Sequence, residues 1–383
     1  MASDTFGPVF RKAPGVLDRV PIIEQFHTGI KILDSVIPIG KGQRELIIGD
    51  RQTGKTTLAL DTIINQKGKN VICVYCWVGG SQASLLKVIH ILEEMEALDY
   101  TIVVAASASA SSGEQYLAPY VAATMAEYFM YSGRDAFVVF DDLTKHAWIY
   151  RELSLLLERS PGREAYPGDI FYLHSQLMER AGRLNSEMGS GSMTFFPIVE
   201  TLQGDITGYV QSNLVSMTDG QVYIASGLFH EGFKPAIDLG LSVSRIGSKV
   251  QSDALREVSD TLRLDYAQYK DLLRLMRVKT KLSTEISEKL RRGEALSLLL
   301  MQNAHKPVSE LELIIQLYAF KRKILEILSP DGLSLFGREI MDYLEELYPA
   351  LLKALLEKKM LSPEIKEEID HAFVEFFREK KVV

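Results

Sequence analysis

The chain has 383 residues, of which 46% are hydrophobic and 24% are charged, an average globular composition that excludes a disordered or fibrous protein. At ~150 residues per domain, this length predicts two or three domains. The net charge of −7 argues against a protein that mainly binds nucleic acid backbones, and two cysteines are too few for a disulfide scaffold.

From about residue 44 to residue 225 the sequence alternates between short apolar runs and longer helical patterns. The apolar runs are rich in Val and Ile, which is typical of strands that are covered on both faces. This alternation predicts an α/β domain around a mostly parallel sheet. The expected strands are Glu45–Ile48, Val71–Tyr75, Thr101–Ala105, Phe137–Phe140, Phe195–Val199 and Val222–Ala225, and the expected helices are Thr56–Gln66, Ser81–Ala97, Gln115–Tyr131 and Thr144–Glu158.

The clearest motif follows the first expected strand. Residues Gly49 to Thr56 read Gly-Asp-Arg-Gln-Thr-Gly-Lys-Thr, which fits G-x-x-x-x-G-K-[ST] between a strand and a helix. In such a loop the backbone N–H groups and the helix N-terminus face the phosphates, Lys55 neutralises the β- and γ-phosphates, and the Thr56 hydroxyl ligates Mg²⁺. The strand–loop–helix context therefore favours a nucleotide site over a chance glycine-rich turn.

An apolar strand that ends in acids supports this site. Phe137–Phe140 is followed by Asp141 and Asp142, and Asp141 is expected to hold hydrated magnesium. An aspartate at a strand end often only caps the next turn, so the combination with the phosphate loop carries the metal hypothesis. Both elements stand at strand C-termini, where open α/β sheets bind their ligands.

Cysteine and histidine patterns predict no further site. Cys73 and Cys76 have C-x-x-C spacing but fall in or just after a strand, so we expect buried thiols rather than a redox pair or a zinc site. His146 and His174 show no metal-ligand spacing, and we expect them to be structural.

The composition changes near Gln251, after which strand patterns disappear and Leu, Glu, Lys and Arg dominate. Val308–Leu328 and Leu335–Lys359 have amphipathic spacing, and Ser362 followed by Pro363 predicts the start of a last helix. We therefore expect a lead segment over 1–20, a P-loop nucleotide-binding domain over 21–251 and a helical domain over 252–383.

Long segments of the chain resemble the alpha subunits of rotary F-type ATP synthases. They are Pro38–Thr56, Pro161–Asp169 and Leu241–Ser248, and the likeness extends from about Ala13 to about Gln316. The resemblance implies a RecA-like domain and an all-α C-terminal domain. It also implies a hexameric ring in which alpha-type subunits such as this chain alternate with catalytic beta-type subunits around a gamma-type shaft. Attachment to an energy-coupling membrane is then indirect, through a proton-translocating sector.

The same resemblance implies a permanent, non-catalytic site for ATP or ADP with Mg²⁺. The metal positions fall on Thr56 and, through water, on Asp141. Arg245 falls at the position of an arginine finger, which is lent to the γ-phosphate in a neighbouring beta-type site and is worth ~10³ to 10⁵ in rate. The expected nucleotide contacts are Gly49, Asp50, Arg51, Gln52, Thr53, Gly54, Lys55, Thr56 and Thr57 for the phosphates, and Phe229, Pro235 and Gln302 for the adenine.

The sequence also departs from the family's pattern. Gly80 stands where a side chain would orient the attacking water, which favours a chain without turnover of its own, although a local slip would bring Gln82 there. Lys234 and Ala304 replace residues beside the adenine, so we expect weaker base contacts. Only about fifty residues precede Lys55, and we expect no N-terminal β-barrel, as in a truncated, cleaved, engineered or divergent form.

Three functions fit these observations. The first is a non-catalytic ring subunit of an ATP synthase that donates Arg245 during ATP synthesis or hydrolysis coupled to proton transport. The second is a self-sufficient hexameric P-loop ATPase or nucleic-acid translocase, which the acidic balance and Gly80 oppose. The third is a nucleotide-stabilised ring scaffold. We expect the first, with no nucleic acid partner. Since no membrane-spanning run or secretion signal is read, we expect bacterial cytoplasm, mitochondrial matrix or chloroplast stroma.

Overall fold

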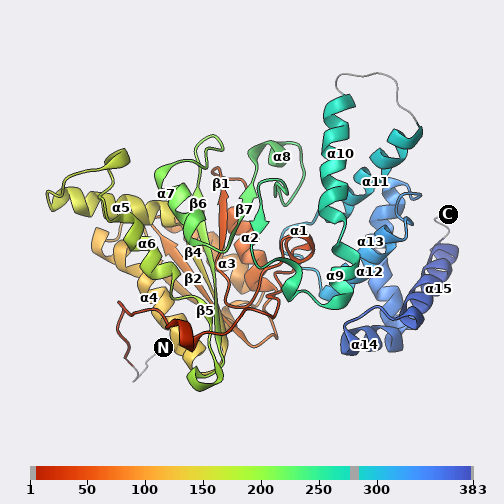
Figure 1. Ribbon diagram of the computed structural model, residues 1–383, viewed down its shortest axis with the longest axis horizontal. Coiled ribbons are helices and arrows are strands. Elements are labelled where there is room, and N and C mark those ends of the chain that lie inside the picture. Colours follow the sequence, from red (N-terminus) through yellow and green to blue (C-terminus); the bar gives the residue numbers. More distant parts are fainter. Residues whose placement is uncertain (1–5, 277–283, 381–383) are drawn as a thin grey trace. The chain divides into compact units, whose positions relative to one another are not determined.

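The computed structural model describes residues 6–276 and 284–380. The chain divides into two compact units (Figure 1). The first contains Met1–Thr28 and Pro38–Val250, and the second contains Gly29–Ile37 and Gln251–Val383. The short helix α1 (Lys31–Val36) thus packs with α9 (Asp253–Ser259) and α12 (Glu310–Lys321) of the second unit. Within the described residues, no helix has the length and apolar character needed to cross a bilayer.

The first unit is built on a mostly parallel sheet, as expected from the apolar runs. Its strand order is β3-β2-β4-β6-β1-β7-β8, with β5 paired to β6, and β5 and β8 are antiparallel to their neighbours. Each expected strand is present and differs from its expected range by a few residues at the ends. The strands are β1 (Glu45–Gly49), β2 (Val71–Val78), β3 (Thr101–Ala106), β4 (Asp135–Asp141), β5 (Gly182–Arg183), β6 (Ser192–Glu200), β7 (Gly220–Ile224) and β8 (Val243–Ser244).

Helices cover the sheet on both faces. Every residue from Cys73 to Val78 of β2 is buried, so neither face of that strand is open to solvent. Cys73 and Cys76 are unbridged and fully buried, as expected for core residues, and this burial raises the pKa of both thiols. The helices of this unit are α2 (Lys55–Ile64), α3 (Gln82–Glu94), α4 (Ser112–Tyr131), α5 (Leu143–Leu156), α6 (Ile170–Met178), α7 (Tyr209–Met217) and α8 (Ser226–His230).

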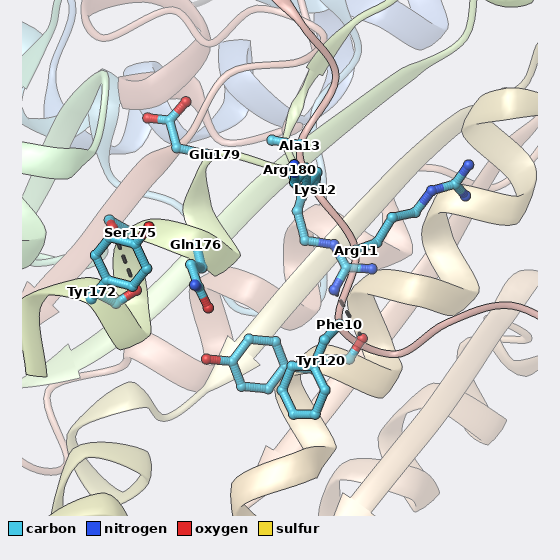
Figure 2. Close-up of a pocket in the computed structure, with 10 residues that line it drawn as sticks. All are labelled: Phe10, Arg11, Lys12, Ala13, Tyr120, Tyr172, Ser175, Gln176, Glu179 and Arg180. Carbon is cyan, nitrogen blue, oxygen red and sulfur yellow. Dashed lines mark hydrogen bonds between the residues drawn. The ribbon is translucent and has the colours of Figure 1, made fainter. Parts of the chain in front are cut away.

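The chain ahead of α1 is attached to α4 and α6 through a buried ion pair. Arg180 and Glu127 are both fully buried, with Nε–Oε1 and Nη2–Oε2 distances of 2.6 and 2.8 Å. Arg180 Nη1 also donates to the carbonyl of Val9 at 3.0 Å. The next residue, Phe10, places its ring 5.0 Å from that of Tyr120, beside a cavity of about 410 Å³ (Figure 2). Val9 and Phe10, near the start of the described chain, are therefore attached to the first unit.

The second unit is all-helical in its described residues, as expected. The amphipathic segment Leu335–Lys359 forms parts of two helices, α13 and α14, because the helical conformation is interrupted at Tyr348. Pro349 lacks an N–H and disfavours the α conformation in the residue before it. The Ser362–Pro363 start is confirmed, with Ile365 N donating to Ser362 Oγ at 3.4 Å. The remaining helices are α10 (Leu262–Met276), α11 (Thr284–Leu300), α13 (Pro330–Leu347), α14 (Pro349–Lys358) and α15 (Pro363–Lys380).

Candidate functional site

The phosphate loop joins β1 to α2 in a conformation that its glycines make possible. A Cβ at Gly49 would lie 2.5 Å from the carbonyl oxygen of Ile224 in β7, so a side chain does not fit there. Gly54 has φ +102°, in the left-handed region that favours glycine. The helix begins at the next residue, Lys55. A glycine-containing loop that leads directly into a helix N-terminus is the arrangement that binds anions through backbone N–H groups.

Lys55 is a buried cation at the centre of this loop. Its side chain is 6% exposed, and its Nζ donates to the Gly49 and Asp50 carbonyls at 2.9 and 2.5 Å. Burial lowers the pKa of Lys55, while the carboxylates of Glu200 and Asp142 act in the opposite direction. An ammonium in this position is suited to phosphate oxygens, which would complete its coordination.

The structure brings together the two residues expected at the metal. Thr56 Oγ1 donates to Asp141 Oδ2 at 2.7 Å. The Tyr75 hydroxyl donates to the same oxygen at 2.7 Å, and the Asp141 carboxylate is 5% exposed. A hydroxyl and a carboxylate are oxygen donors of the kind that Mg²⁺ prefers, so this pair fits the ion. Tyr75 was not foreseen from the sequence.

Asp142 has a structural role beside the metal residues. It is 1% exposed, accepts a hydrogen bond from Lys145 N at 2.8 Å as the N-cap of α5, and pairs with Lys145 Nζ at 2.8 Å. Burial raises the pKa of Asp142 to about 6, with Lys145 opposing and Asp141 reinforcing the shift. The capping role considered for a strand-end aspartate therefore belongs to Asp142, and Asp141 is left to face the loop.

Polar contacts hold the remaining loop residues in place. Asp50 Oδ1 accepts hydrogen bonds from Thr201 Oγ1 at 2.6 Å and Gly204 N at 2.8 Å. Although burial opposes it, these bonds lower the pKa of Asp50. The exposed Arg51 pairs with Glu200 at 2.8 Å. Of the other expected contacts, Gln52 has φ +59°, Thr53 Oγ1 donates to the Asp50 carbonyl at 2.8 Å, and Thr57 lies in the first turn of α2.

Gly80 is enclosed by a tryptophan that the sequence reasoning did not single out. A Cβ on Gly80 would lie 2.1 Å from the ring of Trp77, so the indole occupies the space that a side chain at position 80 would need. The Trp77 ring is buried, and the Lys145 ammonium lies 5.6 Å from its centroid. Gln82, the alternative water-orienting residue, is exposed at the start of α3. Trp77 had no distinguishing pattern, because it reads as one more apolar strand residue.

The structure places two of the three expected adenine contacts on the segment that follows β7, with Phe229 in α8 and Pro235 in the loop after that helix. Phe229 and Pro235 are half-buried after β7, whose Ile224 pairs with Gly49 at the phosphate-loop end of β1. The Lys234 ammonium lies 4.8 Å from the Phe229 ring centroid.

Gln302, the third expected adenine contact, belongs to the second unit. There its amide accepts from Lys31 N at 3.0 Å and donates to the carbonyls of Gly29 and Lys306 at 2.7 and 2.8 Å. These bonds occupy the amide within its own unit.

Arg245 lies at the opposite edge of the sheet from the phosphate loop. Its N–H donates to the Asp219 carbonyl at 2.9 Å, just before β7, and Gly220 pairs with Glu45 at the start of β1. The loop follows Gly49, four residues further along β1, which at ~3.3 Å per residue is about 13 Å away. Arg245 is exposed, and within the described part of the chain its guanidinium has no ion pair or side-chain hydrogen bond.

Comparisons with known proteins agree with this arrangement. Residues 29–244 match the ATP synthase alpha/beta family, nucleotide-binding domain, and residues 251–376 match the ATP synthase alpha/beta chain, C terminal domain. ATP synthase subunit alpha of Petrotoga mobilis is 49% identical over 374 residues, which are 98% of this chain and 74% of that protein. The subunit alpha of Clostridium acetobutylicum is 48% identical over 369 residues, which are 96% of this chain and 73% of that protein.

Proposed function

The chain belongs to the ATP synthase alpha/beta family, among its alpha subunits, and we propose that it holds Mg-nucleotide without turning it over and lends Arg245 to a beta-type neighbour. Such a subunit is part of an ATP synthase complex, a hetero-oligomer with beta subunits, and binds ATP or ADP. The alternating hexameric ring, the gamma-type shaft and the indirect attachment to a proton-translocating membrane sector are parts of the proposal.

The phosphate loop supplies the nucleotide grip in this proposal. Loop N–H groups bind the phosphate oxygens, Lys55 offsets their charge, and Thr56 and Asp141 would hold Mg²⁺. When bound, Mg²⁺ supplies charge neutralisation to the β- and γ-phosphates. The bond from Tyr75 keeps the Asp141 carboxylate oriented toward Thr56. Phe229 and Pro235 offer an apolar surface to the base, where Lys234 replaces a more specific contact.

Binding without turnover follows from the surroundings of Gly80. Phosphate anhydride hydrolysis requires a group that orients or deprotonates the attacking water. Gly80 has no such group, and the Trp77 ring beside it is not basic. A neighbouring subunit with a complete site would therefore carry out the chemistry.

The observation that carries the proposal is the exposed and unpaired guanidinium of Arg245 at the far edge of the sheet. At about 13 Å from its own phosphate loop along β1, it cannot contact a nucleotide bound there. An arginine with a purely structural role at the surface would form a salt bridge, and Arg245 forms none with the residues that the structure describes. A guanidinium without an ion-pair partner at the edge of the sheet is available to stabilise the negative charge that develops on a phosphoryl group in another subunit.

The test is the ATPase activity of the full chain alone, of a matching beta-type partner alone, and of their mixture. We expect no turnover by the chain alone, and activity in the mixture that falls by ~10³-fold or more with Arg245→Ala. Lys249→Ala, which removes an exposed cation four residues further along, is the matched control and should leave activity unchanged. Strong turnover by the chain alone would support the self-sufficient ATPase, and a mixture insensitive to Arg245→Ala would support the scaffold.

A further inference from the structure

A fully buried carboxyl group lies at the strand edge that presents Arg245. Glu45 is the first residue of β1 and is 0% exposed. Its Oε2 accepts a hydrogen bond from Gln43 Nε2 at 2.7 Å, whereas its Oε1 has no hydrogen-bond partner. A carboxylate that is buried and only half satisfied is unfavourable, so the neutral acid is the stable form here.

Gln43 connects this carboxyl to the segment that carries Arg245. The same Nε2 that donates to Glu45 lies 3.2 Å from Ser244 Oγ, and that hydroxyl donates to the Pro38 carbonyl at 2.7 Å. Ser244 is the last residue of β8 and directly precedes Arg245. The packing is close, since a Cβ on Gly220 would lie 2.5 Å from Glu45 Oε2. One side chain, that of Gln43, thus joins the Glu45 carboxyl to the residue that precedes Arg245.

Among the charged groups around Glu45, Arg245 is the cation that is available to pair with the Glu45 carboxylate. Asp219 and Arg245 are the charges that act on Glu45: burial raises the pKa of Glu45 well above its usual range, Asp219 raises it further, and Arg245 opposes the shift. Arg44, the residue before Glu45, is already occupied. Its Nη2 and Nε lie 2.8 and 3.0 Å from the Asp219 carboxylate, and its Nη1 lies 3.0 Å from Glu179 Oε1.

We propose that Glu45 is a positioning residue that keeps Arg245 available to the neighbouring subunit. As the neutral acid, Glu45 leaves the guanidinium unpaired at the strand edge. When Glu45 releases its proton to solvent, the resulting carboxylate pairs through Oε1 with the guanidinium and withdraws it from the edge. The inference rests on the proposed function, because it requires Arg245 to act on another subunit.

The test is the pH profile of ATPase activity in the mixture of the full chain with its beta-type partner, from about pH 6 to about pH 10. Glu45→Gln is an uncharged isostere at every pH. At neutral pH we expect the kcat of Glu45→Gln to match that of the wild type within about twofold. On the alkaline side we expect the wild-type kcat to fall by about tenfold or more while the kcat of Glu45→Gln stays constant, and we expect KM to remain unchanged in both proteins. Glu179→Gln removes another acid at this edge, one that pairs with Arg44, and should follow the wild-type profile.

Two results overturn the inference: alkaline profiles of the wild type and Glu45→Gln that coincide, or a Glu45→Gln mixture that is as inactive as Arg245→Ala at every pH. Should Glu45→Gln not fold, Glu45→Met is also uncharged and of similar volume, and the same expectations apply to it. A mixture that does not respond to Arg245→Ala shows instead that the proposed function itself is wrong. The experiment therefore distinguishes a failure of the positioning role of Glu45 from a failure of the proposed role of Arg245.

Discussion

Acidification is expected to destabilise the first unit through a buried histidine pair. His146 Nδ1 lies 3.3 Å from His174 Nε2, and His146 Nε2 lies 3.0 Å from the Tyr116 carbonyl. The carbonyl only accepts, so His146 Nε2 must carry its proton and Nδ1 must accept from His174. A second proton on His146 would face the N–H of His174. Both rings are therefore neutral in the folded chain.

The magnitude follows from the pKa of His146, which burial lowers to about 4 from 6.5, with the bond to Tyr116 opposing. The unfolded chain then binds the proton more readily, so stability is complete above about pH 6.5 and is lost as pH falls toward 4. At 1.36 kcal/mol per pKa unit, the full loss is about 3 kcal/mol, of which about 2 kcal/mol falls between pH 7 and pH 5. Burial also lowers the pKa of His174, with the same sign.

The assay is urea unfolding at pH 7 and pH 5 of the wild type, His146→Gln and His90→Gln, the last an exposed control. Burial raises the pKa of Asp142 to about 6, so this acid gains stability as pH falls and opposes the histidines. The informative quantity is therefore the difference between wild type and variant. We expect His146→Gln to be less stable at pH 7 and to lose about 2 kcal/mol less on acidification. Equal losses in wild type and His146→Gln would refute the reasoning.

Three further changes test the site and the core. Lys55→Ala should abolish the rise in thermal stability that millimolar Mg-ATP gives the wild type, which is about 2.7 kcal/mol at a hundredfold excess over Kd. Glu127→Gln should cost about 3 to 5 kcal/mol in urea unfolding, because it leaves the buried charge of Arg180 unpaired. Gly80→Gln should cost about 1 to 3 kcal/mol, since its Cβ overlaps Trp77, and less in a Trp77→Ala background; equal costs in both backgrounds would contradict that contact.

The sheet and the phosphate loop could be predicted because local sequence determines them. A strand covered on both faces must be largely apolar, and the central residues of β1, β2 and β4 satisfy this without reference to other strands. The loop needs glycine at Gly49 for the approach of β7 and at Gly54 for its left-handed conformation. The break before Pro349 is also local, and the amphipathic pattern on both sides of it obscured the effect of the proline.

The contacts among side chains around the site depend on strand order, which the sequence does not state. Tyr75 reaches Asp141 because β2 lies beside β4 in the sheet, with Trp77 paired to Asp141. The strands are separated in sequence by β3 and two helices, so no spacing rule connects them. The pairing of Glu45 with the segment before Arg245 likewise depends on β7 lying next to β1. The side-chain contacts that the motifs did not predict therefore depend on the pairing of strands that lie far apart in the sequence.

Binding a nucleotide and hydrolysing it make different demands, and the two edges of one sheet separate them here. Phosphate binding needs backbone N–H groups, one cation and oxygen donors for a metal, and β1, α2 and β4 supply all of these at the C-terminal edge. Hydrolysis also needs a group to orient water, and at Gly80, the position expected to carry that group, the Trp77 ring fills the space that a side chain would need. In the proposed function Arg245 acts on charge that develops on a phosphoryl group in a second subunit, and it lies at the other edge of the sheet. If Arg245 acts in this way, the two features are too far apart to cooperate within one chain, and the chain completes an active site only beside a second subunit.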